Sequence, residues 1–282
     1  MTEELAPERC YRHDGRETYI HCQRCERPIC VDCQTPGAVG VLCPSCVHPG
    51  TTQPVRRRLL RAPGTQTPAV TITLIAITFV IYALQWIPGL GVTEALLYAP
   101  VYSLGEFNSI APYEPWRLLT SVFVHSTGLV LHIILNMYTL WIFGQLLETM
   151  LGRARFLTLY VISGLGGSVA VMYLGDPQTG VVGASGAIFG LLGAFLVIQR
   201  KLGGDSTQLL ILVAINLGIG FLPGMSISWQ AHLGGLVSGI ALGLIFMGTR
   251  RPQQRRSQWQ LLVLAAIALI VLVLVRSPLL LG

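Results

Sequence analysis

The sequence predicts an all-α polytopic membrane protein with a small zinc-binding module in front of its first membrane span. Hydrophobic residues make up 52% of the 282-residue chain and charged residues only 11%, a composition typical of chains immersed in lipid rather than of soluble domains. Apolar segments recur seven times after residue 68. All seven cysteines, in contrast, fall between Cys10 and Cys46, so the chain has two chemically different regions.

Metal-ligating residue types come in four pairs near the N-terminus, and two residues separate the members of each pair. The pairs are Cys10 and His13, Cys22 and Cys25, Cys30 and Cys33, and Cys43 and Cys46. Eight ligands suit two tetrahedral zinc ions, because one tight turn can offer both members of a pair to one ion. A disulfide framework fits less well, since seven is an odd number and a cytosolic location is reducing.

The order of these pairs resembles that of the B-box-type zinc finger, in which the ligand pairs interleave. The resemblance implies two ligand sets, one of Cys10, His13, Cys30 and Cys33 and the other of Cys22, Cys25, Cys43 and Cys46. Such modules often end in histidines, and His21 and His48 are alternative ligands at the edges of this one. We interpret residues 1–50 as a cytosolic module that holds two structural zinc ions and offers a surface to a cytosolic protein partner.

Residues 51–68 are rich in proline, threonine and arginine and are predicted to form a linker. Four arginines cluster there, just before the first apolar span: Arg56, Arg57, Arg58 and Arg61. A solvated linker explains this cluster, and so does contact with anionic lipid head groups. We expect a six-span core over residues 69–250, and residues 251–282 are predicted to add one further span.

The predicted spans cover roughly residues 69–89, 128–150, 155–174, 184–200, 207–222, 230–248 and 258–277. The fourth and fifth are short for a bilayer, which needs about 20 residues, so we expect helices that stop inside the protein at a water-accessible cavity. The long connection 90–127 is apolar and is expected to lie in the outer interface. This connection and the fifth span, with its outer loop, are candidates for the rim and the gate of that cavity.

Basic residues predict the orientation of the spans in the lipid bilayer. They precede the first span and follow the second, fourth and sixth, while the other connections are nearly free of them. The N-terminus is therefore expected in the cytosol and the C-terminus outside, in a multi-pass protein of the plasma membrane. The net charge of +6 is interpreted as a topology signal, and no nucleic-acid partner is expected.

Polar residues from three non-adjacent spans are predicted to share one layer in the outer half of the membrane. Ser185, His232 and Asn136 lie roughly 18–26 Å above the inner ends of their helices at 1.5 Å per residue. His132 lies one turn above Asn136 on the same helix face. Serine becomes a nucleophile when a histidine takes its proton, and histidine, asparagine and backbone N–H groups can stabilise an oxyanion. No acidic residue is expected at this depth, so the pattern favours a Ser–His dyad that needs no catalytic cofactor.

Each of these residues also has an ordinary explanation when it is considered alone. Serine and glycine are common where membrane helices pack, and Asn136 could join two helices by a hydrogen bond. A structural hydrogen bond would also explain His232. Gly235 and Gly239 are given no chemistry; their spacing predicts close approach of the sixth span to the fourth. The coincidence of the polar residues at one depth favours catalysis.

Four sequence motifs resemble those of the rhomboid intramembrane serine proteases over about residues 69–250. They are GASG at Ser185, AHLGG at His232, HIILN at His132 and Asn136, and the Trp116-Arg117 pair. The end of the second span, Gly144-x-x-x-Glu148 followed by Gly152-Arg153, resembles a further motif of that family. The resemblance implies a six-helix rhomboid core, to which this chain adds a seventh transmembrane helix at its C-terminal end.

The same resemblance implies roles for the polar residues. Ser185 would be the nucleophile and His232 the general base and acid, with an oxyanion hole formed by Asn136, His132 and the Ser185 N–H. Phe189 would pack on His232, and Gly183 matches a glycine of the family. His125 receives no role, because its separation from His132 departs from the family's pattern.

We therefore predict a serine endopeptidase that cleaves single-pass membrane proteins near the outer membrane interface. Substrate helices would have to unwind locally, because a helical backbone hides its carbonyl groups. A first alternative is a catalytically inactive protein that binds membrane clients and passes them to partners through its zinc module. A weaker alternative makes that module a ubiquitin-ligase-like domain on a membrane anchor.

Overall fold

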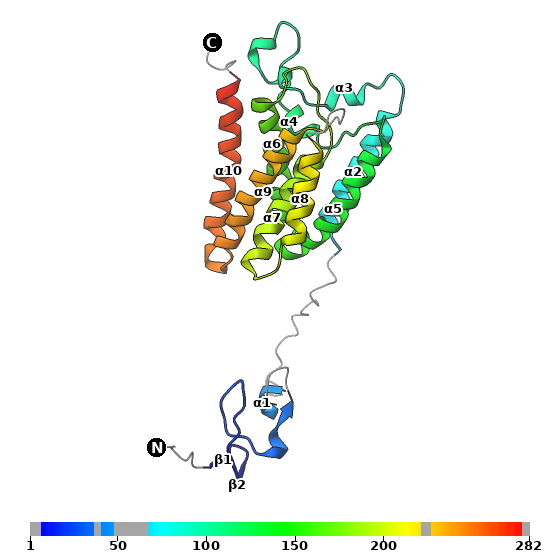
Figure 1. Ribbon diagram of the computed structural model, residues 1–282. Helices are drawn as coiled ribbons and strands as arrows, with labels where there is room; N and C mark the ends of the chain where they lie inside the picture. The colour runs from blue at the N-terminus through cyan, green and yellow to red at the C-terminus, as the bar shows by residue number, and fades with distance from the viewer. Residues whose placement is uncertain (1–6, 37–40, 48–66, 221–226, 278–282) are drawn as a thin grey trace. The chain divides into compact units, whose positions relative to one another are not determined.

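The computed structural model describes residues 7–36, 41–47, 67–220 and 227–277. The chain divides into two compact units, Met1–Pro63 and Gly64–Gly282, which are described separately (Figure 1). Three features predicted from the sequence lie wholly or largely outside the described residues: the arginine cluster of the linker, His48, and the start of the loop after the fifth span.

The N-terminal unit consists of two small antiparallel sheets and short helical turns around buried cysteines. Strands β1 (Glu8–Cys10) and β2 (His13–Thr18) form one sheet, and β3 (Thr35–Pro36) and β4 (Val41–Leu42) form the other. A 3-10 turn η1 (Val31–Cys33) and the short helix α1 (Pro44–Val47) follow strands or loops that carry cysteines. The buried core of this unit contains five cysteines and Ile29, so little apolar surface other than thiols holds it together.

The described part of the second unit contains seven long helices, and each coincides with one predicted span. They are α2 (Ala69–Gln85), α5 (Val130–Leu151), α6 (Arg153–Leu174), α7 (Ser185–Lys201), α8 (Thr207–Ile219), α9 (Trp229–Gly248) and α10 (Arg255–Arg276). Four of the described helices are long and apolar enough to cross a membrane: α5, α6, α9 and α10, the last together with its preceding turn. Helices α7 and α8 have 17 and 13 residues, which confirms that the fourth and fifth spans are short.

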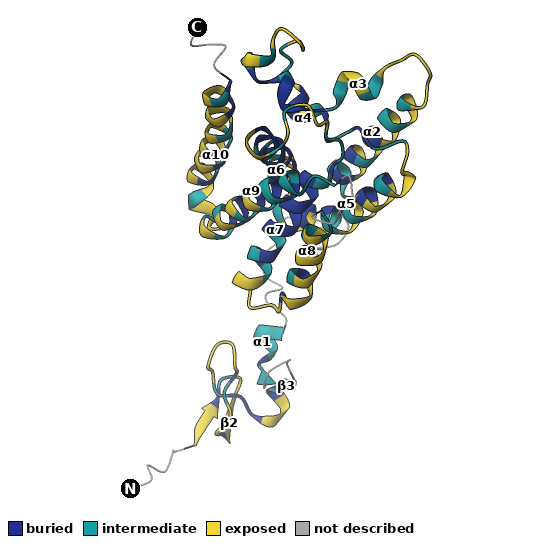
Figure 2. Cartoon of the chain, turned by 45° about the horizontal axis from the view of Figure 1, so that its top comes forward, coloured by how far each residue is buried: buried dark blue, intermediate teal, exposed yellow. Residues whose placement is uncertain are grey.

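Helices α6, α7 and α9 form the centre of the bundle, and their buried faces meet one another (Figure 2). Helices α2 and α5 pack together on one side of this centre, α8 packs on α7, and α10 packs on α6 and α9. Two glycines of α9, Gly235 and Gly239, lie against the backbone carbonyls of Gly186 and Gly190 on α7, where an added Cβ would overlap the oxygen. The predicted close approach of the sixth span to the fourth is therefore confirmed.

Helix α2 begins at a carboxylate supplied by a distant part of the chain. Glu148, near the C-terminal end of α5, is 5% exposed and accepts hydrogen bonds from the backbone N–H groups of Val70 and Thr71 and from the Thr71 hydroxyl. A negative charge is favourable there, because the first N–H groups of a helix have no partner within it. Gly144, one turn before Glu148, has no Cβ and so leaves room for the Thr71 side chain.

The connection 90–127 folds into short helical turns and is anchored by one buried arginine. The turns are α3 (Val92–Leu96), η2 (Pro100–Tyr102), η3 (Gly105–Phe107) and α4 (Arg117–Thr120). The guanidinium of Arg117 is paired with Glu114, donates to the Leu97 carbonyl at 3.1 Å, and lies 4.0 Å from the centre of the Tyr102 ring. The expected position of this connection in the outer interface stays a prediction.

The seventh helix is joined to this connection as well as to the helices. Val273 of α10 packs in a buried cluster with Tyr98 and Leu104 of the connection. Arg276 lies 3.7 Å from the Glu106 carboxylate, and the Tyr173 hydroxyl of α6 donates to the Leu272 carbonyl at 2.8 Å. Helix α10 is therefore an integral part of the bundle.

Candidate active site and metal clusters

Ser185 is the first residue of α7, and a turn at Gly183 brings the chain to it. Gly183 has φ +118°, a conformation that favours glycine, and its N–H donates to the Ser121 carbonyl at 3.0 Å. A Cβ on Gly183 would also lie 2.9 Å from the His132 ring. Only glycine therefore fits two residues before Ser185. The backbone N–H of Ser185 starts the helix and has no partner within it.

His232 lies in the first turn of α9 and is 7% exposed. The Ser228 side chain caps this turn by accepting the Ala231 N–H at 3.3 Å. The His232 ring stacks on Phe189, with ring centres 4.1 Å apart and 15° between the ring planes. Phe189 is one turn after Ser185 on α7, so the contact joins the first two turns of α7 to the first turn of α9. The stacking expected from the family resemblance is confirmed.

Helices α7 and α9 also meet through their backbones at this level. A Cβ on Gly186 would lie 3.2 Å from the Ala231 carbonyl oxygen, which places the residue after Ser185 beside the residue before His232. The His232 Nδ1 is buried and has no hydrogen-bond partner among the described residues. No described acid supports this histidine: Glu148 caps α2, and Asp176 accepts bonds from its own loop.

His132 and Asn136 lie one turn apart on α5, as the sequence predicts, and their backbone and side-chain groups are linked. The Asn136 side chain, which is 7% exposed, donates to the His132 carbonyl at 2.8 Å. The Nδ1 of His132 accepts the Ser126 N–H at 3.4 Å. The other edge of the His132 ring faces Gly183. His132 is therefore brought to the turn that leads into Ser185.

His125 is a buried residue at this turn to which the sequence analysis gave no role. Its side chain is fully buried, and its ring centre lies 5.2 Å from that of His132. Its Nε2 accepts the Ala184 N–H at 3.4 Å. A histidine within the apolar run VFVHS was a visible signal, but sequence spacing does not show which backbone group such a ring would meet.

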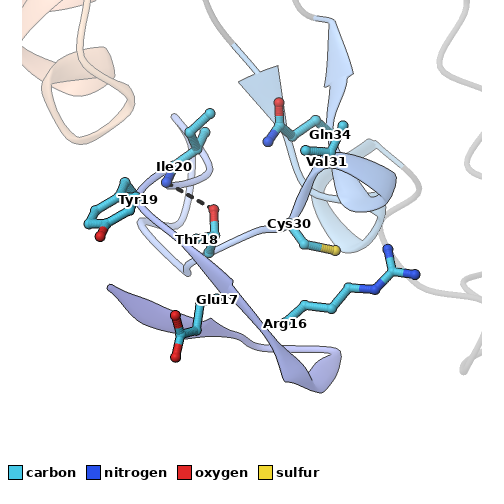
Figure 3. Close-up of a pocket in the computed structure, with 8 residues that line it drawn as sticks. All are labelled: Arg16, Glu17, Thr18, Tyr19, Ile20, Cys30, Val31 and Gln34. Carbon is cyan, nitrogen blue, oxygen red and sulfur yellow. Dashed lines mark hydrogen bonds between the residues drawn. The ribbon is translucent and has the colours of Figure 1, made fainter. Parts of the chain in front are cut away.

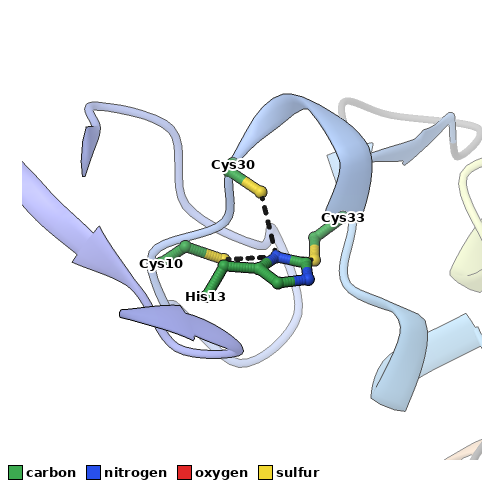
Figure 4. A group of neighbouring side chains, drawn as sticks. All are labelled: Cys10, His13, Cys30 and Cys33. Atoms are coloured by element: carbon green, nitrogen blue, oxygen red, sulfur yellow. Dashed lines mark hydrogen bonds between the residues drawn. The ribbon is translucent and has the colours of Figure 1, made fainter. Parts of the chain in front are cut away.

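The eight metal-ligating side chains of the N-terminal unit gather into two clusters with the expected pairing. Cys10, His13, Cys30 and Cys33 form one cluster, and Cys22, Cys25, Cys43 and Cys46 form the other, with the donor atoms of each set within 4.8 Å of one another. Figure 4 shows the three cysteines around His13. The His13 Nδ1 lies 3.3–3.8 Å from the three sulfurs, and the Cys25 and Cys43 sulfurs are 3.7 Å apart.

These distances fit a tetrahedral cation. Bonds of about 2.3 Å to sulfur and about 2.0 Å to nitrogen place tetrahedral ligand atoms about 3.5–3.8 Å apart. Both clusters could therefore hold a metal ion. His21 belongs to neither, since its Nε2 lies 3.3 Å from the Glu8 carboxylate.

The thiols of the first cluster differ in acidity. Burial opposes ionisation of Cys10, but hydrogen bonds from the backbone at Cys30 and Arg12 outweigh this effect and lower its pKa to about 6. In Cys33, burial and the neighbouring thiols of Cys10 and Cys30 raise the pKa to about 11. Metal ligands must be thiolates, so a bound cation would stabilise the ionised form of Cys33.

A hollow of about 550 Å³ lies on the N-terminal unit, and Cys30 of the first cluster is part of its lining (Figure 3). Its lining includes Tyr19, Ile20 and Val31, and the Arg16 side chain at its edge is paired with Asp32. Glu17 also belongs to the lining. The hollow belongs to the N-terminal unit, whereas Ser185 belongs to the second unit.

Comparison with known proteins identifies the membrane unit. The Rhomboid domain family matches residues 112–249. The chain is 43% identical over 150 residues to RHOMBOID-like protein 5 of Arabidopsis thaliana, which covers 50% of this chain and 46% of that protein. It is 37% identical over 186 residues to the rhomboid protease GluP of Bacillus subtilis, covering 63% of this chain and 35% of that protein. It is also 37% identical over 160 residues to the rhomboid-family protein YdcA of Bacillus subtilis, covering 55% of this chain and 75% of that protein.

The apolar helices of the second unit form a bundle with a polar site at the starts of α7 and α9, where Ser185 is half-buried and His232 is buried. The chain belongs to the rhomboid family. It spans less than half the length of RHOMBOID-like protein 5 and of GluP. The matches therefore identify the family, and what this chain acts on is a separate question.

Proposed function

We propose that the chain is an intramembrane serine endopeptidase in which Ser185 is the nucleophile and His232 the general base. The observation that carries this proposal is the meeting of three helices at one turn. The starts of α7 and α9 lie together at Gly186 and Ala231, and α5 brings His132 to Gly183. Relatives that are named rhomboid proteases support the same activity.

The proposed reaction is acyl transfer followed by hydrolysis. The Ser185 hydroxyl attacks the substrate carbonyl while His232 takes its proton, and the protonated histidine then gives that proton to the leaving amine. Water repeats the sequence on the acyl-enzyme. The negative charge on the carbonyl oxygen is stabilised by the Ser185 N–H at the positive end of α7, together with His132 and Asn136. For this step, the Asn136 amide would add a bond to the substrate oxygen or exchange its present one.

The proposed substrates are single-pass membrane proteins cut near the outer interface, where water reaches a site at the helix starts. Substrate helices need small or helix-breaking residues near the cut, because a helical peptide bond is hidden by its own hydrogen bonds. In the proposed topology the N-terminus is cytosolic and the C-terminus lies outside the plasma membrane. The basic residues at alternate connections support this orientation.

For the N-terminal unit, we propose a B-box-type module over residues 1–50 that binds two structural zinc ions. The fit of both clusters to tetrahedral geometry supports this. Thiolates and an imidazole are ligands that zinc prefers, and closed four-ligand sets point to folding rather than catalysis. The linker at 51–68, the protease core at 69–250 and the seventh helix with the C-terminus at 251–282 complete the proposed division.

Cleavage of a model single-pass substrate in proteoliposomes tests the proposed activity. Wild type should cleave, and Ser185→Ala and His232→Ala should lose activity by at least about a thousandfold while remaining folded. Ser163→Ala is a matched control, because Ser163 is a buried serine on α6 whose hydroxyl has no partner among the described residues. Equal cleavage by all four proteins would refute the dyad. Substrate binding without cleavage by the folded wild type would favour the client-binding alternative.

A further inference from the structure

The side chain of Gln85 holds the backbone of His125 at two points. Gln85 is the last residue of α2, and its amide Nε2 donates to the His125 carbonyl at 2.8 Å while its Oε1 accepts the His125 N–H at 3.0 Å. A backbone N–H can only donate and a carbonyl can only accept, so these partners settle which end of the amide is which. The same Nε2 donates to the Thr93 hydroxyl at 2.7 Å. The backbone position of His125 is therefore tied to α2 and to the start of α3.

The His125 side chain in turn holds the backbone before Ser185. Its Nε2 accepts the Ala184 N–H at 3.4 Å, and the side chain is fully buried. Because the Ala184 N–H can only donate, Nε2 must be unprotonated, and the neutral ring carries its proton on Nδ1. The ring also packs beside His132, with 5.2 Å between ring centres.

The N–H of Ser185 is the first N–H group after the two that these bonds occupy. The Gly183 N–H is taken by the Ser121 carbonyl at 3.0 Å, and the Ala184 N–H is taken by His125. The next donor along the chain is the N–H of Ser185, which opens α7 and has no partner within the helix. Fixing the two preceding N–H groups therefore fixes the direction of the third.

We propose that His125, held by Gln85, is a positioning residue that orients the Gly183–Ser185 turn and with it the oxyanion-binding N–H of Ser185. This inference rests on the proposed function of Ser185. His125 does not act as the base, because the lone pair of its Nε2 is used by Ala184 and its Nδ1 carries the proton. Its contribution is to keep the turn in the geometry that the reaction needs before the substrate arrives.

The test compares His125→Leu with His125→Gln and adds Gln85→Met, all in the full chain. Leucine is close in size to histidine but cannot accept a hydrogen bond, whereas the glutamine oxygen can accept the Ala184 N–H. Methionine keeps the length of Gln85 and removes both of its bonds to His125. Gln199→Met is the matched control, because Gln199 binds the loop at Asp205, at the other end of α7.

The expected result is a change in kcat without a matching change in KM. His125→Leu should lower kcat by about 10- to 100-fold, since a misplacement of about 1 Å at a reacting group costs up to about 100-fold, with KM within about twofold. His125→Gln should recover at least about a third of the wild-type kcat, Gln85→Met should fall between the two variants, and Gln199→Met should match wild type. Wild-type kcat in folded His125→Leu would overturn the proposal.

A second measurement does not depend on activity. Hydrogen–deuterium exchange at the Ala184 and Ser185 amides should be faster in His125→Leu and Gln85→Met than in wild type and the Gln199→Met control. Unchanged exchange would overturn the proposal even if activity fell. If wild type fails to cleave any substrate, the proposed function fails, and the exchange measurement still decides whether His125 holds the turn. If His125→Leu does not fold, Gln85→Met and His125→Gln decide the matter by the same two criteria.

Discussion

Replacing Gly235 with alanine tests how closely the position of Ser185 depends on the contact between α7 and α9. The added Cβ would overlap the Gly186 carbonyl and would lie 2.7 Å from its carbon, where ordinary contact begins at 3.4 Å. The contact with this carbon alone requires a shift of 3.4 − 2.7 = 0.7 Å, and the overlap with the carbonyl oxygen requires a larger one. Both partners are backbone atoms, so a side-chain rotation cannot relieve the overlap.

Such a shift should affect both stability and catalysis. Overpacking in a tight core costs about 1–3 kcal/mol, so the midpoint of thermal unfolding in detergent should fall. Gly186 follows Ser185 directly, and a displacement approaching 1 Å should lower kcat by about tenfold or more. Cleavage of a model substrate in proteoliposomes measures the second effect.

Gly248→Ala is the matched control on the same helix. Nothing lies within 4 Å of a Cβ at Gly248, so this change should leave kcat unaltered, and alanine's higher helix propensity, worth at most about 1 kcal/mol, favours the helix. Wild-type kcat and stability in Gly235→Ala would refute the reasoning, because they would show that the helices separate without cost and without moving Ser185.

Three further changes follow from the same structure. Phe189→Leu removes the ring that stacks on His232. Loss of this contact, worth about 0.5–1.5 kcal/mol, should lower kcat roughly 2- to 10-fold at saturating substrate. An unchanged kcat would show that the stacking does not orient the histidine. Glu148→Gln removes a charged acceptor from the start of α2 and should lower the unfolding free energy by about 2 kcal/mol, whereas Glu94→Gln, at an exposed position, should not. Native mass spectrometry should find two zinc ions in wild type and one in Cys25→Ser, while equal counts would contradict the clusters.

Much of the fold could be predicted because hydropathy and cysteine spacing are local properties. All seven of these helices lie where apolar runs were found, and the two members of each cysteine pair lie in one cluster as their spacing suggested, while the combination of the pairs followed from the family resemblance. The approach of α9 to α7 followed from Gly235 and Gly239, since glycines one turn apart leave a flat surface for a neighbouring helix. Each of these signals is contained within about one or two helical turns of sequence.

The contacts of the connecting segments could not be predicted in the same way. Glu148 caps a helix 77 residues away, and Gln85 holds a residue 40 positions further on. Neither pairing leaves a periodic signal, because it depends on where helices end relative to one another. For the same reason, His125 was visible in the sequence while its partner, the Ala184 N–H, was not. The burial of Arg117 likewise depends on how the connection 90–127 folds over it.

The packing of α10 shows that the end of the matched domain is not the end of the buried packing. The Rhomboid domain match ends at residue 249, six residues before α10 begins. The buried cluster around Tyr98 and Leu104 does not end there, because Val273 of α10 is part of it. A chain cut after residue 249 would keep the whole matched domain and lose part of this buried cluster. In this protein the end of the domain match and the end of the packed unit lie at different positions along the chain.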